Sequence, residues 1–506
     1  MQWLNKVVDE VEKQHPEGEV LIESGVSPSG TYHVGTLREV LTCDAVMLEL
    51  RRRGRQARHI HYVDDLDVFR KVPVNVPGEW EKQLGKPLCD VTSPSGEGSY
   101  ADYFLNDFLG AAQKLHMDME VVRSHEKYRA GAMSELIETA LEKVDKIRKI
   151  IEEVSGRQLE KDWAPIQVME DGYLKNRRFA SLDKAAKKLK YLDSDGQEQT
   201  TSYAAGEVKL TWRVDWAARW HQLGIDVEPF GRDHATKGGS YDTGAAIIKD
   251  VFGSRPPYPV PYNFINLAGE TKKMSKSTGQ IISISDLTEV LPPEVVRYFT
   301  LRYSPDKLLF FDETEGVTKL IDDYAAVLAK SDPADKQLIE ICGVGQDTTV
   351  STIPFSHLVA SYQASLKDPQ KTLDVLGRTE YKTDVQQQAE TIKKELSFID
   401  NWLAKWAPAE LKFELAQNVE LANFTEDQKH FLVQLADKIA GAPVDADGEW
   451  FHKAIYELKE AGGMTPEQVF KPLYQALIAK DSGPRAGWFL SILPRDWLVK
   501  RLRLEA

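Results

Sequence analysis

Two stretches of the chain carry residue types that suit a polyphosphate ligand. Residues 271–279, TKKMSKSTG, place three lysines and two serines in a segment that ends on glycine. Residues 27–36, SPSGTYHVGT, combine hydroxyl side chains and glycines with His33. Ammonium groups can stabilise the charge of a leaving pyrophosphate, and glycines let a nucleotide approach the backbone closely. Together the two stretches predict a nucleotide site.

The elements around the first stretch predict a parallel sheet. Residues 19–25 form a short apolar run typical of a buried strand, and residues 33–54 repeat apolar side chains at helical spacing. Residues 58–65 predict a second strand that ends on acidic residues. Such a βαβ unit binds ligands at the carboxyl ends of its strands, beside a helix N-terminus that favours phosphate. A turn that merely caps the helix would show the same H-x-G pattern at His33.

The remaining chain predicts an interrupted α/β domain followed by a helical region. Charged amphipathic helices and then short polar segments suggest an insertion, after which strands and helices alternate again. We expect a Rossmann-like α/β domain in two halves (1–100 and 211–285), an insertion of helices and a small β-rich segment (101–210), a helical segment (286–332) and an all-helical C-terminal region (333–506).

Composition excludes several classes of protein. With 506 residues, 42% of them hydrophobic, the chain can build several globular cores, and no apolar run is long enough to predict a membrane span. The net charge of −14 argues against a nonspecific DNA-binding protein. Cys43, Cys89 and Cys342 are far apart and form no metal-spaced pair, which is typical of a reducing compartment. We therefore expect a cytoplasmic protein with no DNA or membrane partner.

The two stretches resemble the paired HIGH and KMSKS motifs of class I aminoacyl-tRNA synthetases. Residues 33–36, HVGT, match the first motif at its first and third positions, and residues 273–277 match the second throughout. ESGVSPSGTYHVG, YVDDLDVFRKVP, WRVDWAARW and GRDHATKGGSYDTG resemble class I lysyl-tRNA synthetases in particular. The resemblance covers most of the chain. It implies ATP-dependent activation of lysine, transfer to lysine tRNA, a stem-contact-like segment over 286–332 and a helical-cage anticodon-binding domain over 333–506.

The resemblance also implies roles for individual residues. The catalytic residues that it implies are His33, Lys273 and Lys276, which would hold the leaving pyrophosphate together with Mg²⁺. The ATP-binding residues that it implies are Ser29, Gly30, His33, Gly35, Thr36, Asp233, Lys273, Met274, Ser275, Lys276 and Ser277. The lysine-binding residues that it implies are Gly25, Ser27, Trp212, His234 and Tyr262. Aromatic rings suit the aliphatic stem of lysine, and a phenol oxygen can accept from its ammonium.

The insertion departs from the pattern of the family. Many relatives carry cysteine pairs there that resemble a zinc ribbon, whereas residues 168–202 contain no cysteine. We therefore expect no zinc, because thiolate ligands are absent. Thr36 replaces the last residue of the HIGH motif, and Asn263 stands where many relatives have an acidic residue.

Three other interpretations stay open. The chain could be another class I synthetase, although a glutamyl enzyme would need a basic residue for its substrate and a cysteinyl enzyme usually a zinc site. It could be a non-catalytic paralogue that binds lysine or tRNA, although the intact KMSKS motif and His33 argue for activity. A plain adenylyltransferase would share the H-x-G stretch but would not explain the long helical C-terminal region.

Overall fold

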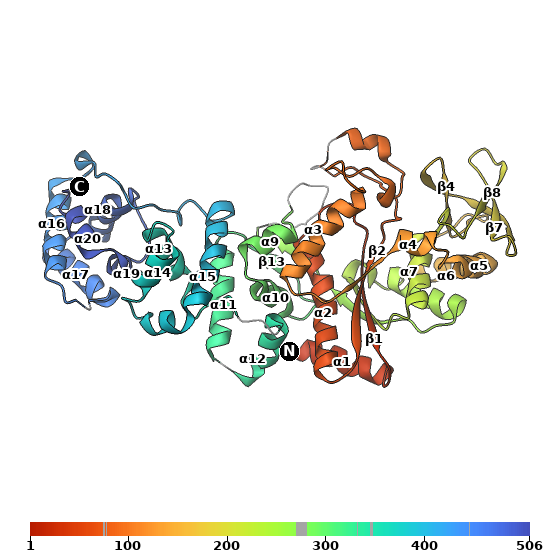
Figure 1. Ribbon diagram of the computed structural model, residues 1–506, viewed down its shortest axis with the longest axis horizontal. Helices are drawn as coiled ribbons and strands as arrows, with labels where there is room; N and C mark the ends of the chain where they lie inside the picture. The colour runs from red at the N-terminus through yellow and green to blue at the C-terminus, as the bar shows by residue number, and fades with distance from the viewer. Residues whose placement is uncertain are drawn as a thin grey trace. The chain divides into compact units, whose positions relative to one another are not determined.

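The computed structural model describes residues 1–73, 76, 78–269, 281–330, 332–344, 348–444 and 446–505 (Figure 1). The chain divides into two compact units. The first consists of Met1–Thr288, Val296–Phe311 and Glu340–Val344, and the second of Glu289–Val295, Asp312–Ile339 and Gly345–Ala506.

A five-stranded parallel sheet forms the centre of the first unit, which confirms the predicted α/β class. Its strands are β1 (Val20–Val26), β2 (Ala57–Val63), β3 (Glu120–Arg123), β10 (Val227–Gly231) and β11 (Tyr258–Tyr262), in the order β11-β10-β1-β2-β3. Strands β2 and β3 follow β1 on one side of it, and β10 and β11, which come later in the chain, lie on the other side of β1. The order therefore reverses between β1 and β10, where sheets of this kind bind ligands.

Strand β3 falls within the range expected to be the insertion. Its sequence, EVVR, is too short to stand out between two helical stretches, yet it pairs with β2 from Ile60 to Val63. β-Branched residues such as Val121 and Val122 fit the pleated surface that this pairing requires. The central sheet thus extends further along the chain than its sequence pattern indicates.

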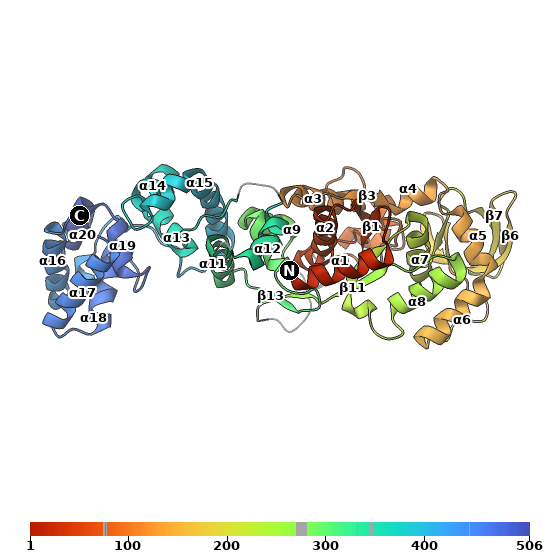
Figure 2. The same cartoon turned by 90° about the horizontal axis from the view of Figure 1, so that it is seen from below.

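Helices cover the sheet and bring side chains to its carboxyl edge. Helix α2 (Leu37–Arg52) packs against β1, β2 and β10, and α1 (Gln2–Gln14) packs on α2 (Figure 1). Helices α6 (Val144–Ser155), α7 (Trp212–Leu223) and α8 (Ser240–Ile247) lie together, as Figure 2 shows. Gly224 ends α7 in the left-handed conformation, with φ 68°.

The insertion holds helices and two small antiparallel sheets. Its helices are α4 (Ser124–Arg129), α5 (Ser134–Glu142) and α6. One sheet has the order β5-β4-β9, from Tyr173–Asn176, Ile166–Glu170 and Val208–Leu210, and the other the order β6-β7-β8, from Arg178–Asp183, Lys188–Leu192 and Glu198–Ser202. The remaining elements of the first unit include α3 (Tyr100–Lys114) and the parallel pair β12 (Ile265–Leu267) and β13 (Leu309–Phe311).

The second unit is helical throughout its described residues. Its main helices are α11 (Glu315–Lys330), α13 (Phe355–Ala364), α14 (Pro369–Leu376), α15 (Lys382–Lys405), α16 (Glu426–Ala440), α17 (Gly448–Ala461), α18 (Pro466–Ile478), α19 (Ala486–Ile492) and α20 (Arg495–Leu502). The chain passes between the two units within the helices α9 (Ile284–Val290), α10 (Pro293–Leu301) and α12 (Pro333–Gly343), and also after Phe311 and after Val344. Among the helices of the described chain, none has the length and apolar character needed to span a membrane.

Candidate active site

A pocket of about 260 Å³ lies at the carboxyl edge of the sheet, at the point where the strand order reverses. Its lining comes from β1, α2, α7, β10 and β11 and from the segments that follow β1, β2, β10 and β11. The predicted lysine-binding residues Gly25, Ser27, Trp212, His234 and Tyr262 all line it, and so does Asp233. The fold therefore brings together residues that are more than 200 positions apart in the sequence.

Aromatic rings form one side of this pocket. Helix α7 begins at Trp212, and Trp216 follows one turn later, so both indoles lie on the same face of the helix. The ring of His234 lies 5.5 Å from that of Trp212 and 5.8 Å from that of Trp216, measured between centroids. Trp212 is 38% exposed, whereas Trp216 is buried. These rings offer an apolar wall for a hydrocarbon chain.

The carboxyl group of Glu39 is hydrogen-bonded to two residues that line the pocket, Gly25 and Tyr262. Glu39, in the first turn of α2, accepts a hydrogen bond from the backbone N–H of Gly25 at 2.7 Å. Its other oxygen accepts from the Tyr262 hydroxyl at 2.5 Å. Burial raises the pKa of Glu39 to about 7, against these two hydrogen bonds, which favour the ionised form. The Tyr262 oxygen keeps its acceptor capacity while its proton is directed at Glu39.

Two more glutamates share one arginine beneath the pocket. Arg219 Nε lies 2.6 Å from Glu23 Oε1, and Arg219 Nη2 lies 3.7 Å from Glu228 Oε1. The guanidinium also covers the Tyr62 ring at 4.4 Å. Burial raises the pKa of Glu23 to about 7 despite Arg219, and it raises that of Glu228 well above its ordinary value. We call Glu23, Glu39 and Glu228 the acidic cluster.

His33 is held by the glycine two residues after it. Its Nδ1 accepts from the Gly35 N–H at 3.1 Å, so a neutral ring carries its proton on Nε2. A Cβ at Gly35 would lie 2.8 Å from Cε1 of His33, so any other residue at this position would require the ring to move. The spacing H-x-G therefore fixes the ring above the turn Val34–Thr36 that leads into α2. In the same loop, the carbonyl of Ser29 accepts from the Tyr100 hydroxyl at 3.3 Å.

The chain that follows the KMSKS stretch is attached to this loop. Val34 donates to the Ile282 carbonyl at 3.0 Å, and Ile284 donates to the Tyr32 carbonyl at 3.1 Å. The predicted residues Lys273, Met274, Ser275, Lys276 and Ser277 lie outside the described residues. The hydrogen bonds of Ile282 and Ile284 bring the segment that resumes at residue 281 next to His33.

The loop after β2 adds acidic residues to the site. Ser27 donates its hydroxyl proton to Asp67 at 3.1 Å. Asp64 lines the pocket and lies 3.0 Å from the ammonium of Lys209, a buried side chain of β9 in the insertion. Burial raises the pKa of Asp64 to about 6, although Lys209 opposes this shift. The insertion thus takes part in positioning the pocket.

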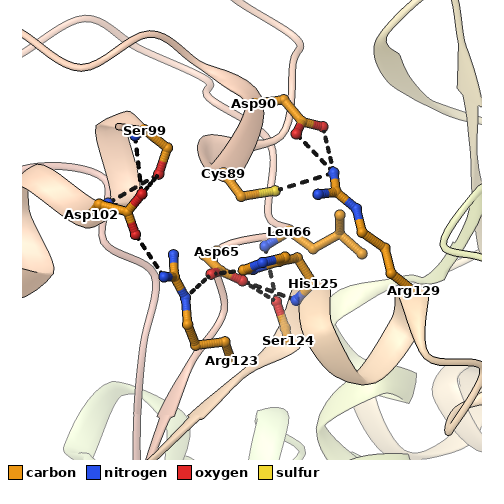
Figure 3. A network of polar contacts seen from close by, with 10 residues as sticks. All are labelled: Asp65, Leu66, Cys89, Asp90, Ser99, Asp102, Arg123, Ser124, His125 and Arg129. Atoms are coloured by element: carbon orange, nitrogen blue, oxygen red, sulfur yellow. Dashed lines mark hydrogen bonds and ion pairs between the residues drawn. The ribbon is translucent and has the colours of Figure 1, made fainter. Parts of the chain in front are cut away.

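A polar network around Asp65 holds this loop in place (Figure 3). Asp65 is fully buried and lies 2.7 Å from Arg123 Nε and 2.6 Å from His125 Nδ1. It also accepts from the Ser124 hydroxyl at 3.0 Å, and that oxygen accepts from the Leu66 N–H at 2.9 Å. Burial opposes ionisation, but the bonds from His125 and the charge of Arg123 hold the pKa of Asp65 below its ordinary value. The network ties β2 to β3 and α4.

Several residues of the site were given no role from the sequence. Glu39, Asp64, Arg219 and Glu228 line the pocket; Asp64 and Arg219 lie within stretches that carry the resemblance, whereas Glu39 and Glu228 lie outside them. A signal was present, because Glu228 lies in the otherwise apolar strand VEPFG. A charged residue inside a buried strand costs free energy unless it is paired, so it points to a functional or ion-paired position.

Comparisons with known proteins match the chain over most of its length. A family model described as tRNA synthetases class I (K) matches residues 1–340, and one described as an anticodon binding domain matches residues 370–505. Lysine–tRNA ligase 1 of Methanosarcina acetivorans is 37% identical and covers 99% of this chain and 98% of that protein. The lysine–tRNA ligases of Archaeoglobus fulgidus (36% identical, 95% and 96% covered) and Pyrococcus horikoshii (34%, 99% and 99%) are also similar. The chain belongs to the class I lysyl-tRNA synthetase family.

Proposed function

We propose that this chain is a lysine–tRNA ligase that activates lysine with ATP and transfers it to the 3′ end of lysine tRNA. The relatives that match nearly the whole chain carry this activity in their names. The observation that carries the proposal is one pocket that combines an aromatic wall with the carboxyl groups of Glu39 and the buried Glu228. Such a pocket suits a substrate with an aliphatic chain that ends in a cation.

Lysine would lie with its stem along the rings of Trp212 and His234. Its side-chain ammonium would point toward the Tyr262 hydroxyl and the acidic cluster, where carboxylate and phenol oxygens accept hydrogen bonds. Its α-amino and carboxylate groups would remain near Gly25 and Ser27, at the end of β1. This orientation directs the carboxylate toward the loop that contains His33.

ATP would bind between that loop and Asp233. The α2 N-terminus and Gly30, Gly35 and Thr36 suit a phosphate chain, and Nε2 of His33 has a proton to donate. The lysine carboxylate attacks the α-phosphorus of ATP, and pyrophosphate leaves while Lys273 and Lys276 stabilise its negative charge. Mg²⁺ on the phosphates would reduce their charge. Catalysis then depends on positioning and electrostatics, because the step needs no protein nucleophile. A hydroxyl of the terminal tRNA adenosine next attacks the lysyl carbonyl and releases AMP.

A glutamate substrate fits this pocket poorly. Its side-chain carboxylate would enter beside the carboxyl groups of Glu39 and Glu228, where burial already disfavours a negative charge, and the pocket-lining Arg219 is paired with Glu23. This environment favours lysine over glutamate among the substrates of class I synthetases.

ATP–pyrophosphate exchange with each of the twenty amino acids tests the proposal. We expect exchange with lysine and at most trace exchange with the other nineteen, followed by charging of purified lysine tRNA. Exchange with a different amino acid, or lysine exchange without charging of lysine tRNA, would refute the assignment.

A further inference from the structure

Arg38 is a buried cation that is held by backbone carbonyls. It lies in the first turn of α2 and is 1% exposed. Its guanidinium donates hydrogen bonds of 2.6–3.0 Å to four carbonyl oxygens, those of Thr300, Ser304, Pro305 and Lys307. In the described part of the chain it forms no ion pair with a carboxylate, and burial lowers its pKa to about 10. A buried charge without an ion pair is costly, which indicates that this position needs the several N–H donors of a guanidinium.

The four carbonyls belong to the end of α10 and to the segment that leads on to β13. Helix α10 ends at Leu301 beside α2 (Figure 1), and the last carbonyls of a helix have no partners within it. Arg38 supplies donors to Thr300 in the helix and to three carbonyls after it. One side chain therefore fixes the course of residues 302–308, which form neither helix nor strand, against the first turn of α2.

This segment in turn supports the end of β11. The Pro305 carbonyl that accepts from Arg38 also accepts from the backbone N–H of Asn263, at 2.8 Å. Asn263 directly follows Tyr262, which is the last residue of β11 and lines the pocket. One carbonyl oxygen thus links the guanidinium on α2 to the backbone beside the pocket. Strand β12, next along the chain, contacts the turn Val34–Thr36.

The first turn of α2 therefore holds the end of β11 in two ways. Glu39 accepts a hydrogen bond from the Tyr262 hydroxyl, whereas Arg38 acts on the backbone of the next residue through Pro305. The same turn of helix continues directly from the loop that contains His33. The loop of His33 and the end of β11 come from different halves of the interrupted α/β domain, and they are aligned at this point.

We propose that Arg38 is a positioning residue for the activation of lysine. It holds the end of β11 against the loop of His33, so that the carboxylate of lysine in the pocket meets the α-phosphate of ATP in line. Arg38 does not line the pocket, so it acts through its neighbours and not on a substrate. A misplacement of about 1 Å between reacting groups can cost about 100-fold in rate. The inference rests on the proposed function, which assigns the two substrates to these places.

The test compares Arg38→Lys with Arg297→Lys. Lysine keeps the positive charge, but a single ammonium cannot reproduce the fork that reaches four carbonyls. Arg297 on α10 is a matched control, since it is also fully buried. It donates to the carbonyls of Leu115 and Ile341 and pairs with Asp44, none of which lines the pocket.

Two steps are measured for each protein, with urea unfolding as a check of the fold. Pyrophosphate exchange reports the activation of lysine. Charging of lysine tRNA from chemically synthesised lysyl-adenylate, without ATP, reports transfer alone. Transfer does not depend on the alignment that Arg38 provides, because the bond between lysine and the α-phosphate is already present in the supplied adenylate.

We expect Arg38→Lys to lower kcat of pyrophosphate exchange about 10- to 100-fold, with transfer from the supplied adenylate within about 3-fold of the wild type. Arg297→Lys should leave both rates unchanged even where it lowers stability. Unchanged exchange in folded Arg38→Lys would overturn the inference. Equal slowing of both steps, or equal slowing of exchange in Arg297→Lys, would also overturn it, since either result marks a general loss of structure.

A second variant keeps the inference testable if Arg38→Lys does not fold. Arg38→Gln keeps an amide donor and removes the buried charge, so it leaves no unpaired cation in the core. We expect the same selective loss of exchange, and exchange at the wild-type rate in folded Arg38→Gln would overturn the inference. All of these outcomes leave the proposed function intact. If the wild type shows no lysine-dependent exchange, the proposed function itself fails, and the inference fails with it.

Discussion

Replacing Gly25 with alanine tests how tightly the pocket is built around Arg219. Gly25 lies in strand β1, whose extended backbone accepts any residue, so Gly25→Ala introduces only a methyl group. That Cβ would lie 2.6 Å from Arg219 Nη2 and 3.4 Å from Glu23 Oε1. The guanidinium would have to withdraw by about 0.8 Å to reach ordinary contact, which stretches its ion pair with Glu23.

Overpacking of this kind costs about 1–3 kcal/mol in a buried site. We therefore expect Gly25→Ala to lower the free energy of unfolding by that amount, and to lower kcat/KM for lysine about 10- to 100-fold as the carboxylates shift. Stability is measured by urea unfolding and activity by pyrophosphate exchange. Gly110→Ala on α3 is the control, because a Cβ there meets no atom within 4 Å, and it should leave activity unchanged.

A second substitution separates the clash from other effects of the methyl group. Lysine lacks the Nη2 atom that Gly25→Ala would strike, so Arg219→Lys should remove the clash at the expense of a weaker ion pair. The two substitutions should therefore be non-additive, with the double variant less impaired than the sum of the single variants. Wild-type stability and activity in Gly25→Ala would refute this reasoning.

The remaining predictions concern the KMSKS stretch, the loop after β2 and the insertion. Lys276→Ala should slow pyrophosphate exchange by orders of magnitude while sparing lysine binding, and an unchanged exchange rate would refute the role of Lys276. Asp65→Asn should cost about 3 kcal/mol of unfolding free energy at pH 7, because it breaks a buried charged network. Since the pKa of Asp65 is lowered by folding, its contribution is present above pH ~4 and is lost at lower pH, so the difference between wild type and variant should shrink toward pH 3; a constant difference would contradict this. Elemental analysis of purified protein should find no stoichiometric zinc, because residues 168–202 contain no cysteine, and one zinc per chain would contradict that expectation.

Sequence patterns predicted the parts of the fold whose local signals are strong. The apolar run at β1 and the helical spacing in α2 are short-range features, and both elements were expected near their observed bounds. Strand β3 was missed because four residues between helices carry too little periodicity. Its strand character comes from pairing with β2, and the partner lies about 60 residues away in the sequence.

The residues of the candidate site likewise fall into those that the sequence predicted and those that it did not. Trp212, His234 and Tyr262 were proposed from the resemblance to the family, and the structure places them in one pocket. Arg219 and Glu228 were not predicted, because their importance depends on which buried groups face them across the sheet. A charge count along the sequence cannot reveal a local surplus of carboxylates, since the surplus arises only when β1, α2 and β10 come together.

A crystal structure with lysine and a non-hydrolysable ATP analogue would test the central claim most directly. We predict that the lysine stem lies against Trp212 and His234, with its ammonium among Tyr262, Glu39 and Glu228. Its carboxylate should face the α-phosphate of the nucleotide, which is held between His33 and Asp233. Lysine bound outside this pocket, or in the opposite orientation with its ammonium toward the nucleotide, would contradict the account.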